Sequence, residues 1–426
     1  MLASRSAAWL HHPGLHLQRT SVQSADRLMP CTVLQRIPFS RNISSFPRKH
    51  HTLLERRSQK NTLHSPCQYR RHITTTSTTL QTTTAATPHP TPVSPNLPAY
   101  HPPTTGLISY LPAPLIPYAE LSRLDKPAGT IYLFFPCLFS TLLAASLTTP
   151  IAAPATALGY SLLFLSGALV MRGAGCSIND LWDRDFDPKV ARTRLRPIAR
   201  GAITPFQGLA YTGVQLLTGL GILVQFPFQC LFYGIPSLLL VATYPLAKRV
   251  THYPQFVLGL TFSWGAMMGF PALGIDLLHN TPALYAAGAL YSSCVAWTVL
   301  YDMIYAHMDI KDDVAAGIKS IALRHEANTK AVLSGLGVVQ ISLLAAAGVA
   351  AGFGPVFFIG SCGGAAVTLA TMIWRVKLKS VANCWWWFRN GCYFTGGAIS
   401  AGLFGEYMMR REQEMEKEEN QGKLVV

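Results

Sequence analysis

Charged residues are scarce in this chain of 426 residues: 13% are charged and 50% are hydrophobic. Because an ordinary soluble domain has about 25% charged residues, the composition excludes a single water-soluble globule. The net charge of +15 comes mainly from the first 119 residues, which hold twelve Lys and Arg and two acids. No basic stripe interleaved with aromatic residues follows, so the charge does not indicate nucleic-acid binding.

Paired cysteines and a secretory signal are also absent from the sequence. None of the nine cysteines forms a CxxC pair, which argues against a zinc site or a disulfide framework. The N-terminal region lacks the apolar stretch of about 7–15 residues that a secretory signal needs. Residues 1–75 are instead rich in Arg and Ser and poor in acids, which is typical of a mitochondrial transit peptide. A disordered cytosolic tail is the alternative interpretation.

Long apolar runs dominate the chain after a Thr- and Pro-rich segment at residues 76–117, which we expect to be a disordered linker. The runs cover residues 129–149, 155–178, 206–226, 228–247, 254–275, 282–306, 330–353, 355–374 and 390–408. Each approaches the ~20 residues that a helix needs to cross a membrane. The sequence therefore predicts an all-α, polytopic membrane protein with nine transmembrane helices in residues 118–408 and a charged C-terminal tail at residues 409–426.

The loops between these runs predict the orientation in the membrane. Lys and Arg occur in the loops after the second, fourth, sixth and eighth runs and are missing from the other loops. This alternation indicates that the N-terminus and the basic loops share one side of the membrane. That side is the matrix if the leader is mitochondrial.

Acidic residues are concentrated in two short segments, at the ends of the second and sixth runs. On a helix, Asp180, Asp183 and Asp187 would share a face, and so would Asp302, Asp309 and Asp313, with Tyr305 between them. Carboxylates this close repel one another and are costly near a bilayer. One interpretation is that they cap helices or pair with nearby arginines. The other is a divalent-cation site, because Mg²⁺ prefers one or two carboxylates together with phosphate oxygens.

Basic and tyrosine side chains are expected at the same level of the membrane. Each taken alone is also typical of a membrane-interface anchor. Together with the acidic segments, they predict a site for a metal-bound diphosphate. These residues are Arg123, Arg194, Tyr244, Lys248 and Lys319.

Six motifs in this region resemble, in the same order, those of the UbiA superfamily of intramembrane aromatic prenyltransferases. NDxxDxxxD begins at Asn179, and YDxxYAxxDxxDD begins at Tyr301 and is followed by GIKS. The segments RLDKPxG, MRGAGCxxND, RTxxRP and YPxxKR match as well. The resemblance spans about residues 118–408, and the form of the second aspartate motif is similar to that of the 4-hydroxybenzoate polyprenyltransferase branch of ubiquinone biosynthesis.

The resemblance implies a nine-helix bundle whose central cavity opens to lipid. The implied reaction transfers a polyprenyl group from polyprenyl diphosphate to 4-hydroxybenzoate, ortho to its hydroxyl, and releases diphosphate. It implies Mg²⁺ bound by Asp180, Asp183, Asp187, Asp309 and Asp313. Substrate-binding residues would be Arg123, Arg172, Asn179, Arg194, Tyr244, Lys248, Asp302, Tyr305 and Lys319. Together with the leader, the resemblance implies a location in the mitochondrial inner membrane with the site facing the matrix. Other ubiquinone-biosynthesis proteins are then candidate partners.

Three alternatives share part of this pattern. A fungal-type meroterpenoid prenyltransferase would use a shorter isoprenoid and another phenol. A haem farnesyltransferase is less favoured, because such relatives lack the full DxxDD ending. A cation transporter is disfavoured, because no internal repeat is apparent and the acids lie at the ends of the runs rather than in their middle.

Overall fold

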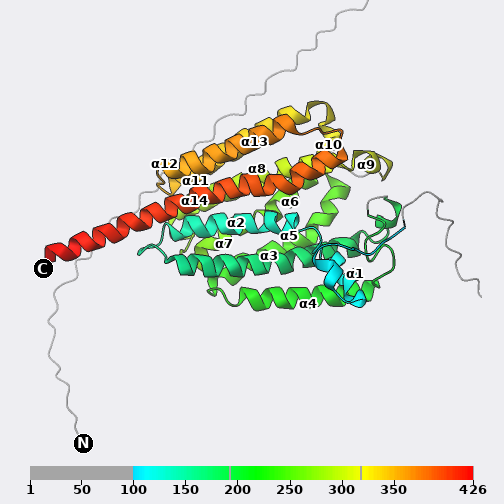
Figure 1. Ribbon diagram of the computed structural model, residues 1–426, viewed down its shortest axis with the longest axis horizontal. Helices are drawn as coiled ribbons and strands as arrows, with labels where there is room; N and C mark the ends of the chain where they lie inside the picture. Colours follow the sequence, from blue (N-terminus) through cyan, green and yellow to red (C-terminus); the bar gives the residue numbers. More distant parts are fainter. Residues whose placement is uncertain (1–98, 191–192, 317–318, 426) are drawn as a thin grey trace, which may run out of the picture. The chain divides into compact units, whose positions relative to one another are not determined.

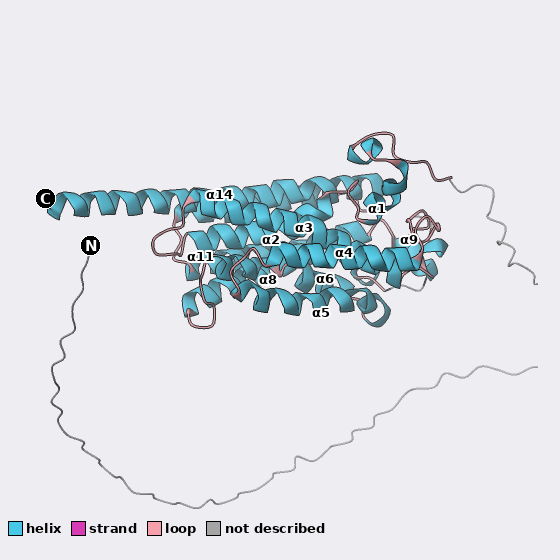
Figure 2. Cartoon of the chain, turned by 90° about the horizontal axis from the view of Figure 1, so that it is seen from below, coloured by secondary structure: helices cyan, strands magenta, loops and turns pink. Residues whose placement is uncertain are grey.

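The computed structural model describes residues 99–190, 193–316 and 319–425, and these residues form helices and loops without strands (Figure 2). Some helical residues are described by their backbone alone. Their side chains are left out at residues 244, 245, 248, 249, 312, 315, 316, 422, 424 and 425. The predicted leader, residues 1–75, and most of the predicted linker lie outside the described residues. The helices belong to the second of two compact units, which spans Thr91–Val426.

Each of the nine predicted apolar runs corresponds to helical structure within the described ranges. The helices are α2 (Ala128–Ala145), α3 (Pro154–Trp182), α4 (Pro205–Leu223), α5 (Gln229–Val250), α6 (Pro254–Phe262), α7 (Gly265–Ala272), α8 (Thr281–Ala306), α11 (Thr329–Ala350), α12 (Pro355–Phe357), α13 (Gly364–Arg375) and α14 (Val381–Val425). A single π-helical stretch, Phe358–Gly363, joins α12 to α13. Among the described residues, five stretches are long and apolar enough to cross a membrane: α2, α3, α8, Glu326–Ala350 and Pro355–Arg375. The all-helical membrane fold is confirmed, and the number of nine spans stays a prediction.

Short helical turns precede the bundle and overlap the predicted linker. They are η1 (Leu107–Tyr110), η2 (Ala113–Leu115) and α1 (Ile116–Leu121). Proline stands in the first turn of both η2 and α1, where its fixed φ favours a helix, and Ile108 is buried. Residues 107–110 and 113–117 are therefore helical at the end of the segment predicted as linker, and the linker itself stays a prediction.

The core of the bundle is built around α8 and α2. Helix α8 packs against α11 and α6, and α2 packs against α7, α3 and α14. In the core the ring of Tyr132 stacks on that of Tyr301 with centroids 3.6 Å apart. Gly269 of α7 allows the helices to approach closely, because a Cβ there would lie 2.3 Å from the backbone of Ser140. Small residues serve this purpose in membrane helix packing.

The exterior of the bundle is apolar, as a lipid-facing surface requires. Leu217 of α4, Leu239 of α5 and Ile359 are each at least 70% exposed. At one end of the bundle lie α1, the loop after α3, and the short helices α9 (Ile310–Ala316) and α10 (Ile321–Arg324) that follow α8 (Figure 1). Both acidic segments therefore lie at the same end. The predicted charged tail is the end of α14, which extends beyond the other helices at the opposite end.

Candidate functional site

The first acidic segment begins in the last turn of α3, where Asp180 is 1% exposed. Both of its carboxylate oxygens accept hydrogen bonds from Arg123 Nη2, at 2.8 and 2.9 Å. The Nη1 of Arg196 lies 3.2 Å from Asp180 Oδ1. Since a buried carboxylate is costly unless it is paired, the two guanidinium groups compensate the burial of Asp180.

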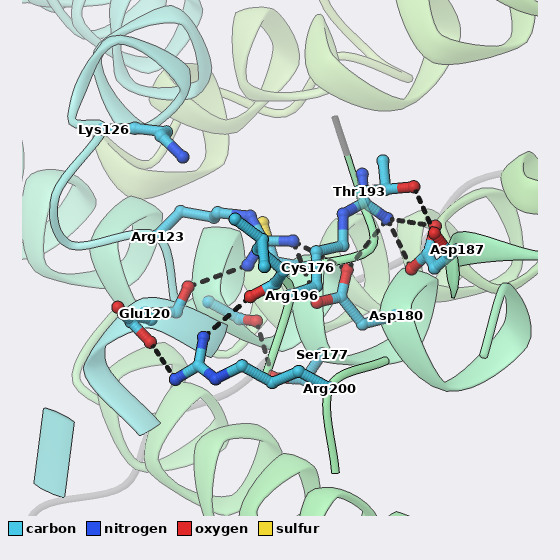
Figure 3. A network of polar contacts seen from close by, with 12 residues as sticks. Glu120, Arg123, Lys126, Cys176, Ser177, Asp180, Asp187, Thr193, Arg196 and Arg200 are labelled. Carbon is cyan, nitrogen blue, oxygen red and sulfur yellow. Dashed lines mark hydrogen bonds and ion pairs between the residues drawn. The ribbon is translucent and has the colours of Figure 1, made fainter. Parts of the chain in front are cut away.

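Asp187 completes this network from the short helix η3 (Asp187–Lys189). Arg196 Nη1 donates to both Asp187 oxygens, at 3.0 and 2.9 Å. The Thr193 hydroxyl donates to the backbone carbonyl of Asp187 at 2.9 Å. Burial raises the pKa of the Asp187 carboxyl, and the charge of Arg196 opposes that rise. Figure 3 shows the resulting chain of contacts from Arg123 through Asp180 and Arg196 to Asp187.

The expectation that each acidic segment continues one helix is wrong. Helix α3 ends at Trp182, and Asp183 is its C-cap with non-helical φ and ψ. Helix α8 likewise ends at Ala306, before Asp309. Asp180 and Asp187 come together because the chain turns and Arg196 bridges them, rather than because they share a helix face.

Arg123 reaches Asp180 from a strained position in the loop between α1 and α2. Its φ is 56°, in the left-handed region that costs an L-residue about 1–2 kcal/mol. Its Nη1 donates to the Glu120 carbonyl at 2.8 Å, while its Nη2 reaches Asp180. The surrounding contacts thus hold Arg123 in this conformation, which is often found at functional sites.

Arg172 lies two helical turns before Asp180 on α3. Its Nη1 donates to Cys176 Sγ, and its guanidinium carbon lies 5.8 Å from the ring centroid of Phe262. Its buried Nε has no hydrogen-bond partner among the described residues. The group lies directly over Gly129, where a Cβ would be 2.4 Å from that Nε. A buried donor without a partner carries a desolvation cost that an anion from a substrate would relieve.

The second acidic segment runs from the end of α8 into α9. Asp302, Asp309 and Asp313 are each half-buried. The Asp313 amide donates to the Asp309 carbonyl at 2.8 Å, which places these two residues one helical turn apart. The half-buried Tyr305 packs its ring 4.6 Å from that of Phe388.

His307 stabilises the turn at the end of α8 through contacts of both ring nitrogens. Its Nδ1 lies 2.8 Å from the Met303 carbonyl, and its Nε2 lies 3.0 Å from Thr329 Oγ1. These contacts tie the end of α8 to the start of α11. They fix the backbone from which Asp309 projects, a role that the sequence pattern did not reveal.

The predicted basic residues lie at this end of the bundle. Lys319 Nζ contacts the carbonyl of Val250 at 3.5 Å, so the segment after α9 reaches the end of α5. Tyr244 and Lys248 belong to the last turns of α5, and their side chains lie outside the described residues. Arg194 is half-buried in the loop before α4, and Asn179 is half-buried beside Asp180. The sequence hypothesis assigned Arg194 to the site but not Arg196, which is the second Arg of the RTxxRP motif.

The aspartates offer the oxygen donors that Mg²⁺ prefers. No three His, Cys, Asp or Glu side chains form a preassembled metal cluster in the described ranges. Mg²⁺ nevertheless takes only one or two carboxylates and fills its other positions with water and phosphate oxygens. The donor set therefore fits Mg²⁺ bound together with a phosphate-bearing substrate.

Comparison with known proteins places these features in a family. The model of the UbiA prenyltransferase family matches residues 133–396. The mitochondrial 4-hydroxybenzoate polyprenyltransferase of Saccharomyces cerevisiae is 46% identical over 295 residues, which are 68% of this chain and 77% of that protein.

Two solved structures share the fold. A UbiA homolog from Aeropyrum pernix K1 has a TM-score of 0.54 at 22% identity and covers 64% of this chain and 96% of its own. A UbiA homolog from Archaeoglobus fulgidus bound to GPP and Mg²⁺ has a TM-score of 0.51 at 16% identity and covers 70% and 99%. At these identities the two structures show the fold alone.

Proposed function

Since the chain belongs to the UbiA prenyltransferase family, we propose that it transfers a polyprenyl group from polyprenyl diphosphate to 4-hydroxybenzoate in ubiquinone biosynthesis. The observation that carries the proposal is the 46% identity, over 68% of the chain, to a protein with that activity in its name. The same relative supports a location in a mitochondrial membrane. The basic loops favour the inner membrane with the site toward the matrix, where other ubiquinone-biosynthesis proteins are candidate partners.

The reaction begins when the bond between the allylic carbon and the diphosphate oxygen breaks. Negative charge then develops on the departing diphosphate, and fixed cations lower the barrier by stabilising it. We assign Arg123, Arg194, Lys248 and Lys319 to the diphosphate, and Tyr244 to its positioning. The support comes from two contacts: Arg123 pairs with Asp180 of the first acidic segment, and Lys319 lies 3.5 Å from the carbonyl of Val250, two residues after Lys248.

Metal binding is assigned to the aspartates of the two segments. Mg²⁺ would be held by Asp180, Asp183, Asp187, Asp309 and Asp313, with Asp302 and Tyr305 beside them. When bound, Mg²⁺ supplies positive charge that neutralises the diphosphate. Arg123 and Arg196 pair with the buried carboxylates, and their positive charges compensate part of the cost of burying them.

The aromatic acceptor is assigned to Arg172 and Asn179. The unpaired, buried Nε of Arg172 can donate to an acidic substrate group. The ring carbon ortho to the hydroxyl attacks the allylic cation and forms the new carbon–carbon bond. The same carbon then loses its proton, which restores the aromatic ring. Apolar side chains such as Phe262, which packs against Arg172, help to keep water away from the cation.

A transfer assay tests this proposal directly. The full-length protein in detergent is incubated with Mg²⁺, 4-hydroxybenzoate and a polyprenyl diphosphate, and products are identified by mass spectrometry. The expected product is 4-hydroxybenzoate carrying one polyprenyl group, together with diphosphate. Transfer only to another phenol, or only from a short isoprenoid, would favour the meroterpenoid alternative, and no transfer to any phenol would reject the proposal.

A further inference from the structure

A further ion pair lies beside the site, between α1 and the loop before α4. Arg200 Nη2 donates to Glu120 Oε2 at 2.6 Å, and both side chains are 14% exposed. The Tyr100 hydroxyl donates to the other oxygen of Glu120 at 2.8 Å. The Tyr100 ring centroid also lies 3.7 Å from the guanidinium carbon of Arg200. Tyr100 thus covers the ion pair, and a pair shielded from water is stronger than an exposed one.

Arg200 connects this pair to the loop that carries Arg196. Its Nη1 donates to the Leu195 carbonyl at 2.7 Å, and its amide donates to the Arg196 carbonyl at 2.9 Å. Arg200 therefore binds the backbone carbonyls of both Leu195 and Arg196. Because Arg194 directly precedes Leu195, the same contacts restrict Arg194 as well as Arg196.

Glu120 also connects the pair to Arg123. Its backbone carbonyl accepts a hydrogen bond from Arg123 Nη1 at 2.8 Å. Glu120 thus anchors two chains of contacts, one through Arg200 to Arg196 and one to Arg123. Both chains end at Asp180 (Figure 3).

We propose that Glu120 and Arg200 are positioning residues that hold Arg123 and the Arg194–Arg196 loop in the geometry that binds polyprenyl diphosphate. The inference rests on the proposed function and adds Glu120, which precedes the family match at residues 133–396, and Arg200, which lies within it. Neither residue contacts the diphosphate in this account. Their effect passes through Arg123, Arg194 and Arg196, and it falls on the diphosphate rather than on the aromatic acceptor.

The test is a double-mutant cycle with Glu120→Gln, Arg200→Gln and the double variant. Each single change should raise the KM for polyprenyl diphosphate about tenfold, since small displacements of positioned groups have effects of this order or larger. The KM for 4-hydroxybenzoate should change less than about twofold, and kcat less than about threefold, on the same reasoning. Because the two residues act as one pair, the double variant should resemble either single variant. Unchanged diphosphate KM in both single variants, or effects that multiply in the double variant, would overturn the proposal.

Glu419→Gln is the matched control. It removes a carboxylate 2.6 Å from Lys423, in an exposed ion pair of α14 away from the site, and it should leave every constant unchanged. Hydrogen exchange of residues 193–204 gives a readout without turnover. Exchange should increase in both Glu120→Gln and Arg200→Gln and stay unchanged in Glu419→Gln, and equal exchange in all three variants would overturn the positioning role. Absence of transfer activity in the wild-type protein would be evidence against the proposed function. The exchange comparison would still test whether Glu120 and Arg200 order the loop.

Discussion

Arg196 joins the two buried aspartates of the first acidic segment, with its Nη1 3.2 Å from Asp180 Oδ1 and 2.9 Å from Asp187 Oδ2. The two aspartates lie on separate elements, one in α3 and the other in η3. One guanidinium therefore fixes the turn that follows α3. It also compensates two negative charges at the place where a metal-bound diphosphate is proposed to bind.

Replacement of Arg196 tests this bridge. Arg196→Gln should lower the free energy of unfolding by about 1–3 kcal/mol, because it leaves buried carboxylates with less compensation. Arg196→Lys should retain part of the stability, since it keeps the charge but loses the planar geometry. The measurement is thermal or denaturant unfolding in detergent, with the exposed Arg184→Gln as control. An Arg196→Gln protein as stable as this control would contradict the bridging role.

Neutral replacements of the aspartates test metal binding. Asp180→Asn and Asp309→Asn should each lower kcat/KM for transfer by at least about 100-fold, the order expected when a charge-stabilising group is lost. Both proteins should remain folded in membranes, because the amide has nearly the shape of the carboxylic acid. Transfer rates and size-exclusion profiles provide the measurement. Near-normal turnover in both variants would exclude the proposed roles.

Removal of divalent cations should stop transfer. Carboxylate oxygens at the site suit a small, hard cation that also binds diphosphate, so a chelator should abolish product formation and added Mg²⁺ should restore it. Ca²⁺ should restore less, because it prefers more ligands at longer distances. Product is quantified in the same assay with each ion. Full activity in excess chelator would contradict a metal-bound diphosphate.

Alanine substitutions at two glycines test the role of Arg172, one as the test variant and the other as its control. Gly129→Ala should raise the KM for 4-hydroxybenzoate about tenfold, because the new Cβ would lie 2.4 Å from Arg172 Nε and displace its guanidinium. Gly175→Ala on α3 should leave this constant unchanged, since no atom lies within 4 Å of its Cβ. It should also stabilise the helix by about 1 kcal/mol. Equal acceptor KM in the two variants would remove Arg172 from the acceptor site.

The helices follow from the sequence because each long apolar run has one favourable backbone arrangement in lipid. The break in the fifth run does not follow from hydropathy. Helix α6 ends at Phe262 and α7 begins at Gly265, where a Cβ would lie 2.3 Å from Cys137 Sγ. The close approach of α2 at this glycine is a tertiary contact, which an apolar pattern does not contain.

The site is predictable in its composition and less so in its geometry. Asp180 and Asp187 stood out because acids are rare in this part of the chain. Their connection through Arg196 depends on a turn after Trp182, and the i, i+7 spacing wrongly suggested one continuous helix. Glu120 and Arg200 were not found, because they are 80 residues apart and only the fold brings them to 2.6 Å.

Both acidic segments are proposed to bind one metal–diphosphate complex. The position of Mn²⁺ tests this proposal, if Mn²⁺ is located by anomalous scattering in crystals of the full-length protein grown with an unreactive diphosphate analogue. Mn²⁺ bound to the diphosphate should contact both the Asp180–Asp187 segment and the Asp309–Asp313 segment. Mn²⁺ and analogue bound away from either segment would contradict it.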